Sequence, residues 1–452
     1  MEFDKIISEI SSFVWGYPLL FILIGGGLYL LFVSKFLPFK YFFHAIDIVR
    51  GKFNDKKSDG EISHFQALTT ALSATVGMGN IAGVAVAISI GGPGAIFWMW
   101  VSGIIGMSTK FFTSALAVMY RGVDSAGKKQ GGPMYFIVNG LGKKWFPMAM
   151  FFSFCGMVGA LPVFNVNQLT QAINDIVLKP NGFEVSLFSN AIIGLILIIL
   201  TSIVILGGLK RISRVSARLV PFMVGVYIIS ILAILIVNYN NVPEYLYLIF
   251  YDAFNADYYS GNSALGGVLG ALIILGIRRG AFSNEAGIGM APMAHGAAKT
   301  NNPIKEGFVA MLGPFIDTLM VCTMTALAIL VTGAWKTQAD GVSLTAAAFE
   351  SSFSGIGNYI LLACVFVFSI SSLFSYSYYG TKCLSFIAGD NNKKKYNYIY
   401  IISIMLGATT SLSMMINLID TFFALMAIPT MIATLILAPK VLNELKKYEI
   451  KR

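Results

Sequence analysis

The sequence predicts an all-α, polytopic membrane protein with eleven transmembrane helices. The chain has 452 residues, of which 56% are hydrophobic and only 12% charged, roughly half the charge of a typical soluble domain. Its apolar residues gather in eleven runs of about 20 residues or more, enough for a helix to cross a bilayer. Its basic residues concentrate in alternate segments between these runs. These features exclude an ordinary soluble enzyme, a disordered protein and a secreted disulfide scaffold.

The predicted spans follow the apolar runs in chain order. They are 15–36, 64–90, 93–120, 145–176, 187–208, 213–238, 262–290, 306–333, 357–388, 396–416 and 419–438. The first run is too long for a signal peptide and follows a net acidic segment, which a signal peptide does not. Residues 37–63 are amphipathic and are expected to lie along the membrane surface. Residues 239–261 hold no Lys or Arg and suit an interfacial helix or lid.

The basic residues predict the orientation. Counted by these spans, 28 of the 32 Lys and Arg residues, including Arg278 and Arg279, fall on the side that holds the C-terminus. The positive-inside rule then predicts a cell-membrane protein with an extracellular N-terminus and a cytoplasmic C-terminus. Because the net charge of +10 is explained by orientation, no nucleic-acid partner is expected; the partner is the lipid bilayer.

Two predicted spans are interrupted by glycine near their middles. The second contains a glycine-rich run from Ser73 to Gly83, and the seventh contains another from Gly266 to Gly280. The two spans are five helices apart, so they enter the membrane from opposite sides. Paired discontinuous helices of this kind indicate an inverted repeat with a transport site near the midplane. The alternative is that these glycines only permit close helix packing.

An unwound segment can bind charge without charged side chains. Backbone that leaves the helix inside a membrane persists only where it lines a cavity or is buried in protein. Its free amides suit a carboxylate, and its free carbonyls suit a hard cation or an ammonium group. The two breaks could therefore hold a zwitterionic amino acid together with Na⁺.

Polar residues of the fourth span share one helical face. Phe164, Gln168 and Gln171 are spaced i, i+4 and i+7. We expect this face to meet the substrate, because a glutamine can donate to a carboxylate and accept from an ammonium. The alternative is that these glutamines only join neighbouring helices.

Charged residues inside spans are costly and indicate function. Lys110 and Asp317 are predicted to form a structural or gating ion pair. Glu285 is expected to join Arg278 and Arg279 in an inner charge network that opens and closes.

The remaining reactive residues do not predict catalysis. Asp420 lies near the outer end of the last span and is expected to be interfacial. The four cysteines are expected to be small buried hydrophobes. No catalytic triad, phosphate-binding loop or carboxylate pair is present in the sequence, so neither an enzyme nor an organic cofactor is expected.

Four segments carry a family resemblance. They are VGMGNIAGVA at 76–85, GGPGAIFWMWVSGIIG at 91–106, GGPMYFI at 131–137 and RRGAFSNEAGIGMAPMAHGAA at 278–298. They resemble the signatures of the alanine or glycine:cation symporter family. The resemblance implies a fold like that of the bacterial leucine transporter, with two inverted five-helix repeats, and import of alanine or glycine coupled to Na⁺ by alternating access.

The resemblance also implies a division of the chain. The parts are an extra helix and surface loop at 1–63, a first repeat at 64–238, an extracellular loop at 239–261, a second repeat at 262–438 and a cytoplasmic tail at 439–452.

Site residues follow from the same resemblance. Thr75 and Gly79 would contact the substrate, and the amides of Gly77, Met78 and Gly79 would face its carboxylate. In the seventh span, unwound carbonyls for the ammonium and an apolar wall would come from Ile273, Ile274, Leu275 and Gly276.

A sodium site is implied between the second and ninth spans. Its hydroxyl ligands would be Ser371 and Ser372, with backbone oxygens from Ala74, Gly77 and Phe368. Such oxygens suit hard cations. The alternative is that each serine bonds back to its own helix. Because the seventh span lacks the hydroxyls of some relatives, a second sodium site beside the substrate is in doubt.

Two other functions stay open at this point. A proton-coupled permease of the same architecture would need a titratable group at the site, and the breaks at 74–80 and 273–277 contain none. A channel should carry rings of charge or a filter repeat, which the sequence does not have.

Overall fold

The computed structural model describes residues 9–11, 13–53, 58–125, 127–255, 265–337, 339, 341–410 and 413–451. These residues are mostly helical. Their only strands form a two-residue antiparallel pair, β1 (Gly122–Val123) and β2 (Lys129–Gln130), in which Gly122 lies opposite Gln130.

Two sharp bends mark the N-terminal third of the chain. The first follows α2 (Tyr17–Leu20), η1 (Phe21–Gly25) and α3 (Gly26–Val33), where the chain turns by 79° into α4 (Leu37–Val49). The second separates α5 (His64–Thr75) from α6 (Met78–Gly91), which are bent by 44°. The predicted break in the second span is therefore confirmed.

The other elements of the first half begin with the long helix α7. They are α7 (Gly94–Met119), α8 (Pro133–Leu141), η2 (Lys143–Trp145), α9 (Phe146–Gly159), α10 (Val163–Ile173), η3 (Asn174–Leu178), α11 (Leu187–Ile205), α12 (Gly208–Val237), η4 (Tyr239–Asn241) and α13 (Val242–Asn255). The helix expected within 239–261 is α13.

The second half is equally helical. Its elements are α14 (Leu265–Asn284), α15 (Ala291–His295), α16 (Pro303–Pro314), η5 (Phe315–Cys322), α17 (Thr323–Val331), η6 (Ala334–Lys336), α18 (Gly341–Ser352), α19 (Gly357–Ala388), η7 (Asp390–Asn392), α20 (Lys393–Thr409), α21 (Ser413–Leu425) and α22 (Ala427–Lys451).

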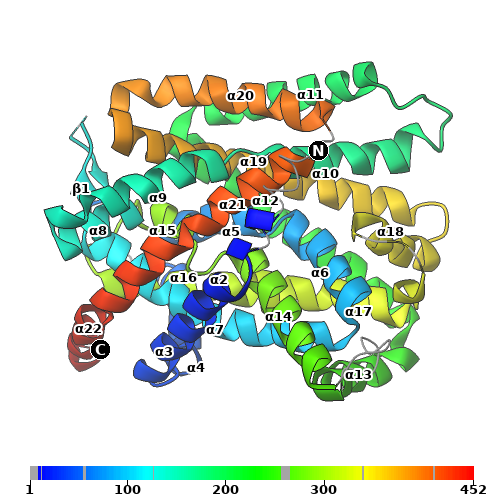
Figure 1. Ribbon diagram of the computed structural model, residues 1–452, viewed down its shortest axis with the longest axis horizontal. Coiled ribbons are helices and arrows are strands. Elements are labelled where there is room, and N and C mark those ends of the chain that lie inside the picture. Colours follow the sequence, from blue (N-terminus) through cyan, green and yellow to red (C-terminus); the bar gives the residue numbers. More distant parts are fainter. Residues whose placement is uncertain are drawn as a thin grey trace.

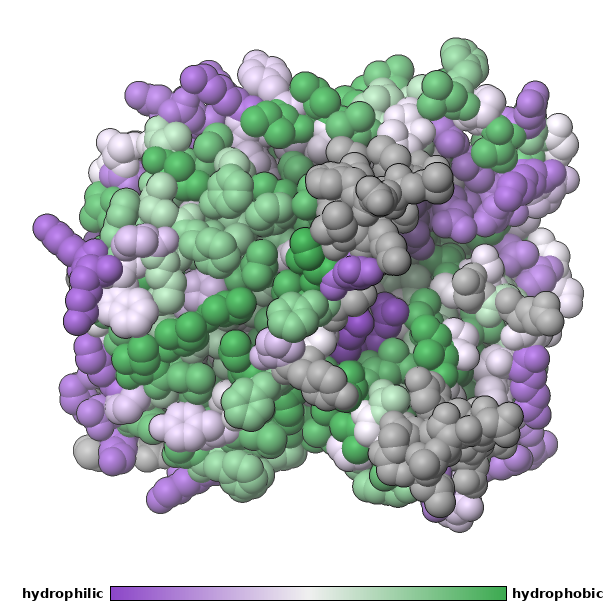
Figure 2. All heavy atoms as spheres, viewed as in Figure 1, coloured by the Kyte–Doolittle hydropathy of each residue, from purple (hydrophilic) through white to green (hydrophobic). Residues whose placement is uncertain are grey.

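The surface is that of a multi-pass membrane protein. Within the described residues, seven helices are long and apolar enough to cross a bilayer, and nine if each bent pair counts as one span. Figure 2 shows hydrophilic side chains gathered at both ends of the long axis and a largely hydrophobic band between them. We call these ends the β1 end, which also holds the C-terminus, and the α18 end, which also holds α13 (Figure 1).

Burial separates the centre of the bundle from its lipid-facing rim. The most apolar stretch of α7 is 89% buried, whereas those of α11 and α12 are only 28% and 33% buried. At its N-terminus α7 is held by α13, because the Gly94 amide donates to Asp252 Oδ2 at 2.7 Å and Trp98 Nε1 donates to the Ala253 carbonyl at 3.1 Å. The four cysteines are free and buried, as predicted.

Candidate transport site

The first break lies between α5 and α6. A capping box starts α5, in which the Gln66 amide donates to Ser63 Oγ and the Ser63 amide donates to Gln66 Oε1. The helix ends at Thr75, and the chain resumes as a helix at Met78. The Gly77 amide donates to Asn80 Oδ1 at 2.9 Å. The Gly77 amide is therefore already hydrogen-bonded, contrary to the prediction that it faces a carboxylate. Met78 and Gly79 lie in the first turn of α6, where backbone amides have no acceptor within the helix.

Asn80, which was not predicted as a site residue, ties this break to the rest of the bundle. Its side chain is fully buried, and its Nδ2 donates to Ser283 Oγ and to the Asp317 carbonyl, both at 3.0 Å. Because Asn80 also accepts from Gly77, one amide group fixes three segments that the site depends on.

A small inner cavity of about 50 Å³ opens at the first break. Its volume exceeds the roughly 10–15 Å³ that a cavity needs to hold one water molecule. Of the predicted substrate residues it brings together Thr75, Gly77, Met78, Gly79 and Phe164. It also receives residues not expected there, Glu285, Tyr376 and Asp420.

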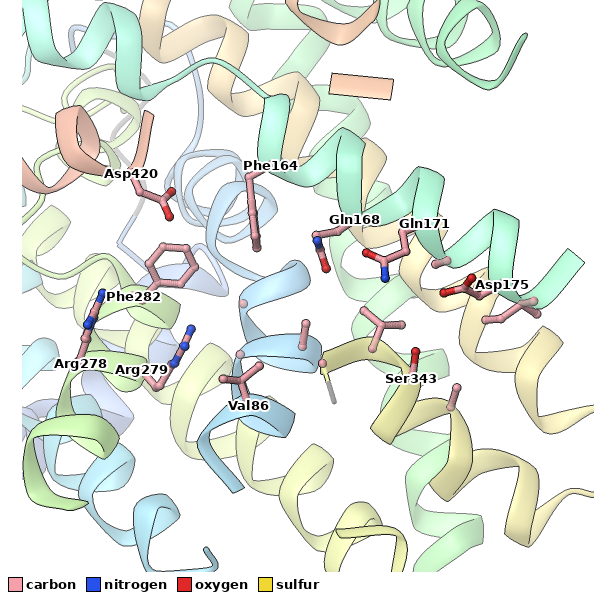
Figure 3. Close-up of a pocket in the computed structure, with 18 of the residues that line it drawn as sticks. Val86, Phe164, Gln168, Gln171, Asp175, Arg278, Arg279, Phe282, Ser343 and Asp420 are labelled. Carbon is pink, nitrogen blue, oxygen red and sulfur yellow. The ribbon is translucent and has the colours of Figure 1, made fainter. Parts of the chain in front are cut away.

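An outer vestibule of about 350 Å³ leads from the inner cavity towards α18. Gln168 and Gln171 line it together with Phe164, so the predicted polar face of the fourth span does point into a cavity. Figure 3 shows the vestibule running from Asp420 and Phe282 past the two glutamines to Asp175 and Ser343. The glutamines lie in this vestibule and not in the inner cavity.

Two aromatic rings stand between the cavities. Phe164 and Phe282 line both of them, and their ring centroids are 6.1 Å apart in an edge-to-face arrangement. Phe282 also packs against Trp15 and Phe423. The two rings therefore stand at the junction of the vestibule and the inner cavity.

The prediction for the second break is wrong in position. Helix α14 is continuous from Leu265 to Asn284, so residues 273–276 are helical and line neither cavity. Gly276 and Gly280 instead allow contact with α7: a Cβ on Gly276 would lie 2.6 Å from the Trp98 Cβ, and one on Gly280 would lie 2.7 Å from the Ser102 Cβ. These glycines serve close packing, the alternative kept open above.

The actual break covers residues 285–290, between α14 and α15. Its backbone needs left-handed conformations, with φ of 52° at Glu285, 88° at Gly287 and 108° at Gly289. Only glycine adopts such angles readily. The signal in the sequence was the Gly-X-Gly pattern at 287–289, which repeats Gly77-Met78-Gly79 of the first break.

Glu285 therefore lies at the inner cavity and not in a network with the two arginines. Its side chain is buried, Tyr376 donates a hydrogen bond to its Oε1 at 2.6 Å, and its Oε2 has no partner in the described residues. Arg278 and Arg279 line the vestibule beside Asp420, and Arg278 stacks over Trp15 at 5.8 Å. Asp420 is thus a cavity residue and not interfacial. The two arginines lie within helix α14.

The predicted sodium ligands converge between α5 and α19. Ser372 Oγ lies 3.4 Å from the Ala74 carbonyl and 3.1 Å from the Phe368 carbonyl. Ser371 Oγ lies 2.8 Å from the Phe368 carbonyl and 3.2 Å from the Ser73 carbonyl. A Cβ on Gly77 would lie only 2.9 Å from Ser372 Oγ. Each serine bonds to its own helix, and each also reaches across to the end of α5.

Lys110 and Asp317 are both buried but form no ion pair in the part of the chain that the structure describes. Thr318 donates to Asp317 Oδ1, while the Asp317 carbonyl accepts from Asn80. The Lys110 ammonium points towards Gly313 of α16, where a Cβ would lie 3.2 Å from Nζ. The predicted direct pair is therefore not formed, although the two opposite charges lie close enough to interact through space.

A buried cluster towards the β1 end was not predicted. Glu306 of α16 receives His295 Nδ1 at 2.6 Å and also contacts His64 Nδ1. All three side chains are at most 3% exposed. The residues are far apart in the sequence, so only the fold brings the starts of α5 and α16 and the end of α15 together.

A second set of contacts, made by Arg121 and Lys129, joins the segments next to this cluster. Arg121 donates to the carbonyls of Gly296, Ala298 and Thr300 at 2.7, 2.5 and 2.8 Å. Lys129 pairs with Asp59 at 2.5 Å, and this hydrogen bond lowers the pKa of the Asp59 carboxyl. These contacts join Arg121 and Asp59 to the segment after α15, whereas the vestibule leads towards the α18 end.

A solved structure shares this fold. The crystal structure of MhsT in complex with L-phenylalanine matches with a TM-score of 0.60, covering 83% of this chain and 89% of that one at 13% identity. The molecule therefore has the fold of a leucine-transporter-like membrane transporter.

Sequence comparisons then show the family. The model of the sodium:alanine symporter family matches residues 1–452, and the chain belongs to that family. It is 39% identical to the sodium/alanine symporter AgcS of Methanococcus maripaludis, covering 100% of this chain and 99% of the relative. It is 33% identical to the amino-acid carrier protein AlsT of Bacillus subtilis, covering 100% and 93%. The protein is a secondary transporter and not an enzyme.

Proposed function

We propose that the protein imports alanine, glycine and similarly small neutral amino acids together with Na⁺. One observation carries the proposal: a cavity of about 50 Å³ lies where two broken helices meet, lined by main chain from one and by a buried carboxylate from the other. That combination offers both a partner for a carboxylate and a partner for an ammonium.

The substrate would lie with its two charged ends on the two breaks. The amides of Met78 and Gly79, at the positive end of α6, suit its carboxylate. The unpartnered Oε2 of Glu285 suits its ammonium group. Thr75 completes the wall, and the rings of Phe164 and Phe282 leave space for only a small side chain.

Sodium would bind beside the first break, on the oxygens of Ala74, Gly77, Phe368, Ser371 and Ser372. The contacts between α19 and the end of α5 support this position. An ion there would join the two helices, so that the substrate finds its amides already aligned. This gives a physical reason for coupling, because the ion stabilises the substrate-binding arrangement.

Alternating access would use the two closures on either side of the cavity. We infer that Phe164 and Phe282 close the α18 side, while the cluster of His64, Glu306 and His295 opens on the β1 side. The moving parts would be two inverted five-helix repeats at 64–238 and 262–438, preceded by an extra helix at 1–63, giving eleven spans. The segments 239–261 and 439–452 would be an extracellular loop and a cytoplasmic tail, with the N-terminus outside.

The test is uptake of labelled alanine into proteoliposomes. We expect an inward Na⁺ gradient to drive accumulation, and excess unlabelled glycine to compete with it. Uptake that ignores an imposed Na⁺ gradient would contradict the proposal.

One observation favours proton coupling as a second candidate. The second break holds Glu285, a titratable group at the inner cavity. In sodium-free vesicles a pH gradient would then drive alanine uptake, and Glu285→Gln would abolish that uptake. Sodium-driven uptake without any response to pH gradients would exclude this candidate.

A further inference from the structure

A third cavity lies apart from the transport path. Its volume is about 290 Å³, and it shares no lining residue with the vestibule or the inner cavity. It lies where the end of α19, the start of α12, the start of α20 and strand β2 meet. The proposed transport cycle gives it no role.

One wall of this cavity presents a buried cation. Lys382 of α19 is only 5% exposed, and its Nζ has no hydrogen-bond partner in the described part of the chain. Its ammonium lies over the face of the Tyr378 ring, at 5.3 Å from the centroid, and Glu61 is the carboxylate that acts on it most strongly through space. A buried ammonium without an acceptor is costly, so a ligand with an anionic oxygen would be stabilised there.

No carboxylate of the described residues lies within ion-pair distance of the Lys382 ammonium. Lys393 pairs instead with Asp390 and, at 3.6 Å, with Asp124. The remaining charged groups that line the cavity are Lys382, Lys128 and Glu61. Because these six charges sum to zero, an anion would be stabilised by direct contact with the unpartnered ammonium, and Glu61 would accept from a cationic or hydroxyl group carried by the same ligand.

The opposite wall is apolar and continues onto the lipid-facing surface. It is formed by Ile205, Leu206, Leu209 and Ile212 at the junction of α11 and α12. Leu206 is 66% exposed, and α11 and α12 are the least buried of the membrane-capable helices. An alkyl chain leaving this cavity would therefore pass directly onto the apolar surface of the bundle.

We propose that this cavity binds the phosphodiester headgroup of a membrane phospholipid, with the phosphate on Lys382 and an acyl chain along Leu206. The phosphodiester would supply the anionic oxygen that the Lys382 ammonium lacks as a hydrogen-bond acceptor. The amine of an ethanolamine headgroup, or the hydroxyls of a glycerol headgroup, would meet Glu61. A lipid held here would connect α12, α19 and α20 at the β1 end.

Native mass spectrometry of the full-length protein with defined lipids tests this site. We expect phosphatidylglycerol and phosphatidylethanolamine to stay bound, and diacylglycerol with the same chains not to bind. Lys382→Gln should lower the lipid-bound fraction at least about tenfold, the effect of losing a charge-assisted hydrogen bond. Lys395→Gln, on an exposed lysine outside the cavity, should leave it unchanged.

Two further arms separate a lipid from a free anion. Leu206→Asn replaces an exposed residue, so this variant should fold even if Lys382→Gln does not. We expect Leu206→Asn to weaken the retention of phospholipid. Inorganic phosphate should not displace the lipid at millimolar concentration. The proposal would be overturned if Lys382→Gln retained as much phospholipid as the unmodified protein, or if diacylglycerol bound as well as phospholipid. It would also be overturned if phosphate displaced the lipid and Leu206→Asn had no effect.

Discussion

The two breaks that line the inner cavity are built differently. The first break is short: α5 and α6 are separated only by Val76 and Gly77, and Asn80 caps the gap. The second extends over residues 285–290 and needs three left-handed residues. The first contributes main-chain groups and lies against two hydroxyls of α19, whereas the second contributes a carboxylate. A binding site for a zwitterion needs both kinds of partner.

The comparison also shows which glycines break a helix. Helix α14 contains Gly270, Gly276 and Gly280 and is nevertheless continuous. The last two lie against α7, where a side chain would collide with it. The helix ends at Asn284, where Glu285 turns left-handed, and the glycines that the break itself requires are Gly287 and Gly289, whose φ angles are positive. Glycine density therefore locates close packing as readily as it locates a break.

The largest loss of alanine affinity is expected for a substitution of Glu285, the carboxylate at the second break. Glu285→Gln keeps the shape of the side chain but removes the proposed partner of the substrate ammonium. Loss of one member of a buried charge pair costs about 2–5 kcal/mol, so alanine affinity should fall about 30-fold or more. Calorimetric titration with alanine measures it. Asp175→Asn, at the mouth of the vestibule, is the matched control, and equal losses in both variants would contradict the assigned role.

The next largest effect is expected on Na⁺ dependence, for a substitution of Ser372 beside the first break. Ser372→Ala removes one proposed oxygen ligand of Na⁺, and a hydrogen bond or ligand to a charged group contributes about 1.5–3 kcal/mol. The Na⁺ concentration for half-maximal uptake should rise about tenfold or more. Ser403→Ala removes a buried hydroxyl that bonds only within α20 and should have no such effect. An unchanged Na⁺ dependence in Ser372→Ala would remove this serine from the site.

A glycine exchange sharpens the distinction between breaking and packing. Gly287→Ala places a side chain at a φ of 88°, with a Cβ 2.8 Å from Met431 Sδ; such strain costs about 1–3 kcal/mol. Gly276→Ala overpacks the contact with α7 at about the same cost. Both should lower the thermal midpoint, but only Gly287→Ala should also weaken alanine binding. Gly270→Ala, with nothing within 4 Å of its Cβ, should do neither; weaker alanine binding in Gly276→Ala would contradict the reassigned break.

The smallest effect is expected in the vestibule. Gln171 lines the outer cavity but not the inner one. Gln171→Ala should therefore raise the KM for alanine by at most about threefold, as expected for one neutral hydrogen bond at a wet site. Uptake kinetics in proteoliposomes measure it. A loss as large as that in Glu285→Gln would move the substrate outward.

Local patterns predicted part of this site, and tertiary packing decided the rest. The break at Gly77 and the face of Phe164, Gln168 and Gln171 are visible in short stretches of sequence, whereas the paired serines of α19 were expected from the family resemblance. The position of the second break is not, because a glycine against a neighbouring helix and a glycine with positive φ look alike in sequence. The cluster of Glu306 with two histidines depends on segments that only the fold brings together.

The central claim is that Na⁺ at Ser371 and Ser372 prepares the first break for a small amino acid. Calorimetric titration with alanine, in buffers that contain either Na⁺ or only a large organic cation, tests this claim most directly. We predict saturable binding of one alanine in Na⁺, and binding at least about tenfold weaker without it, the effect of a coupling free energy above ~1.4 kcal/mol. Equal affinity in the two buffers would contradict the account.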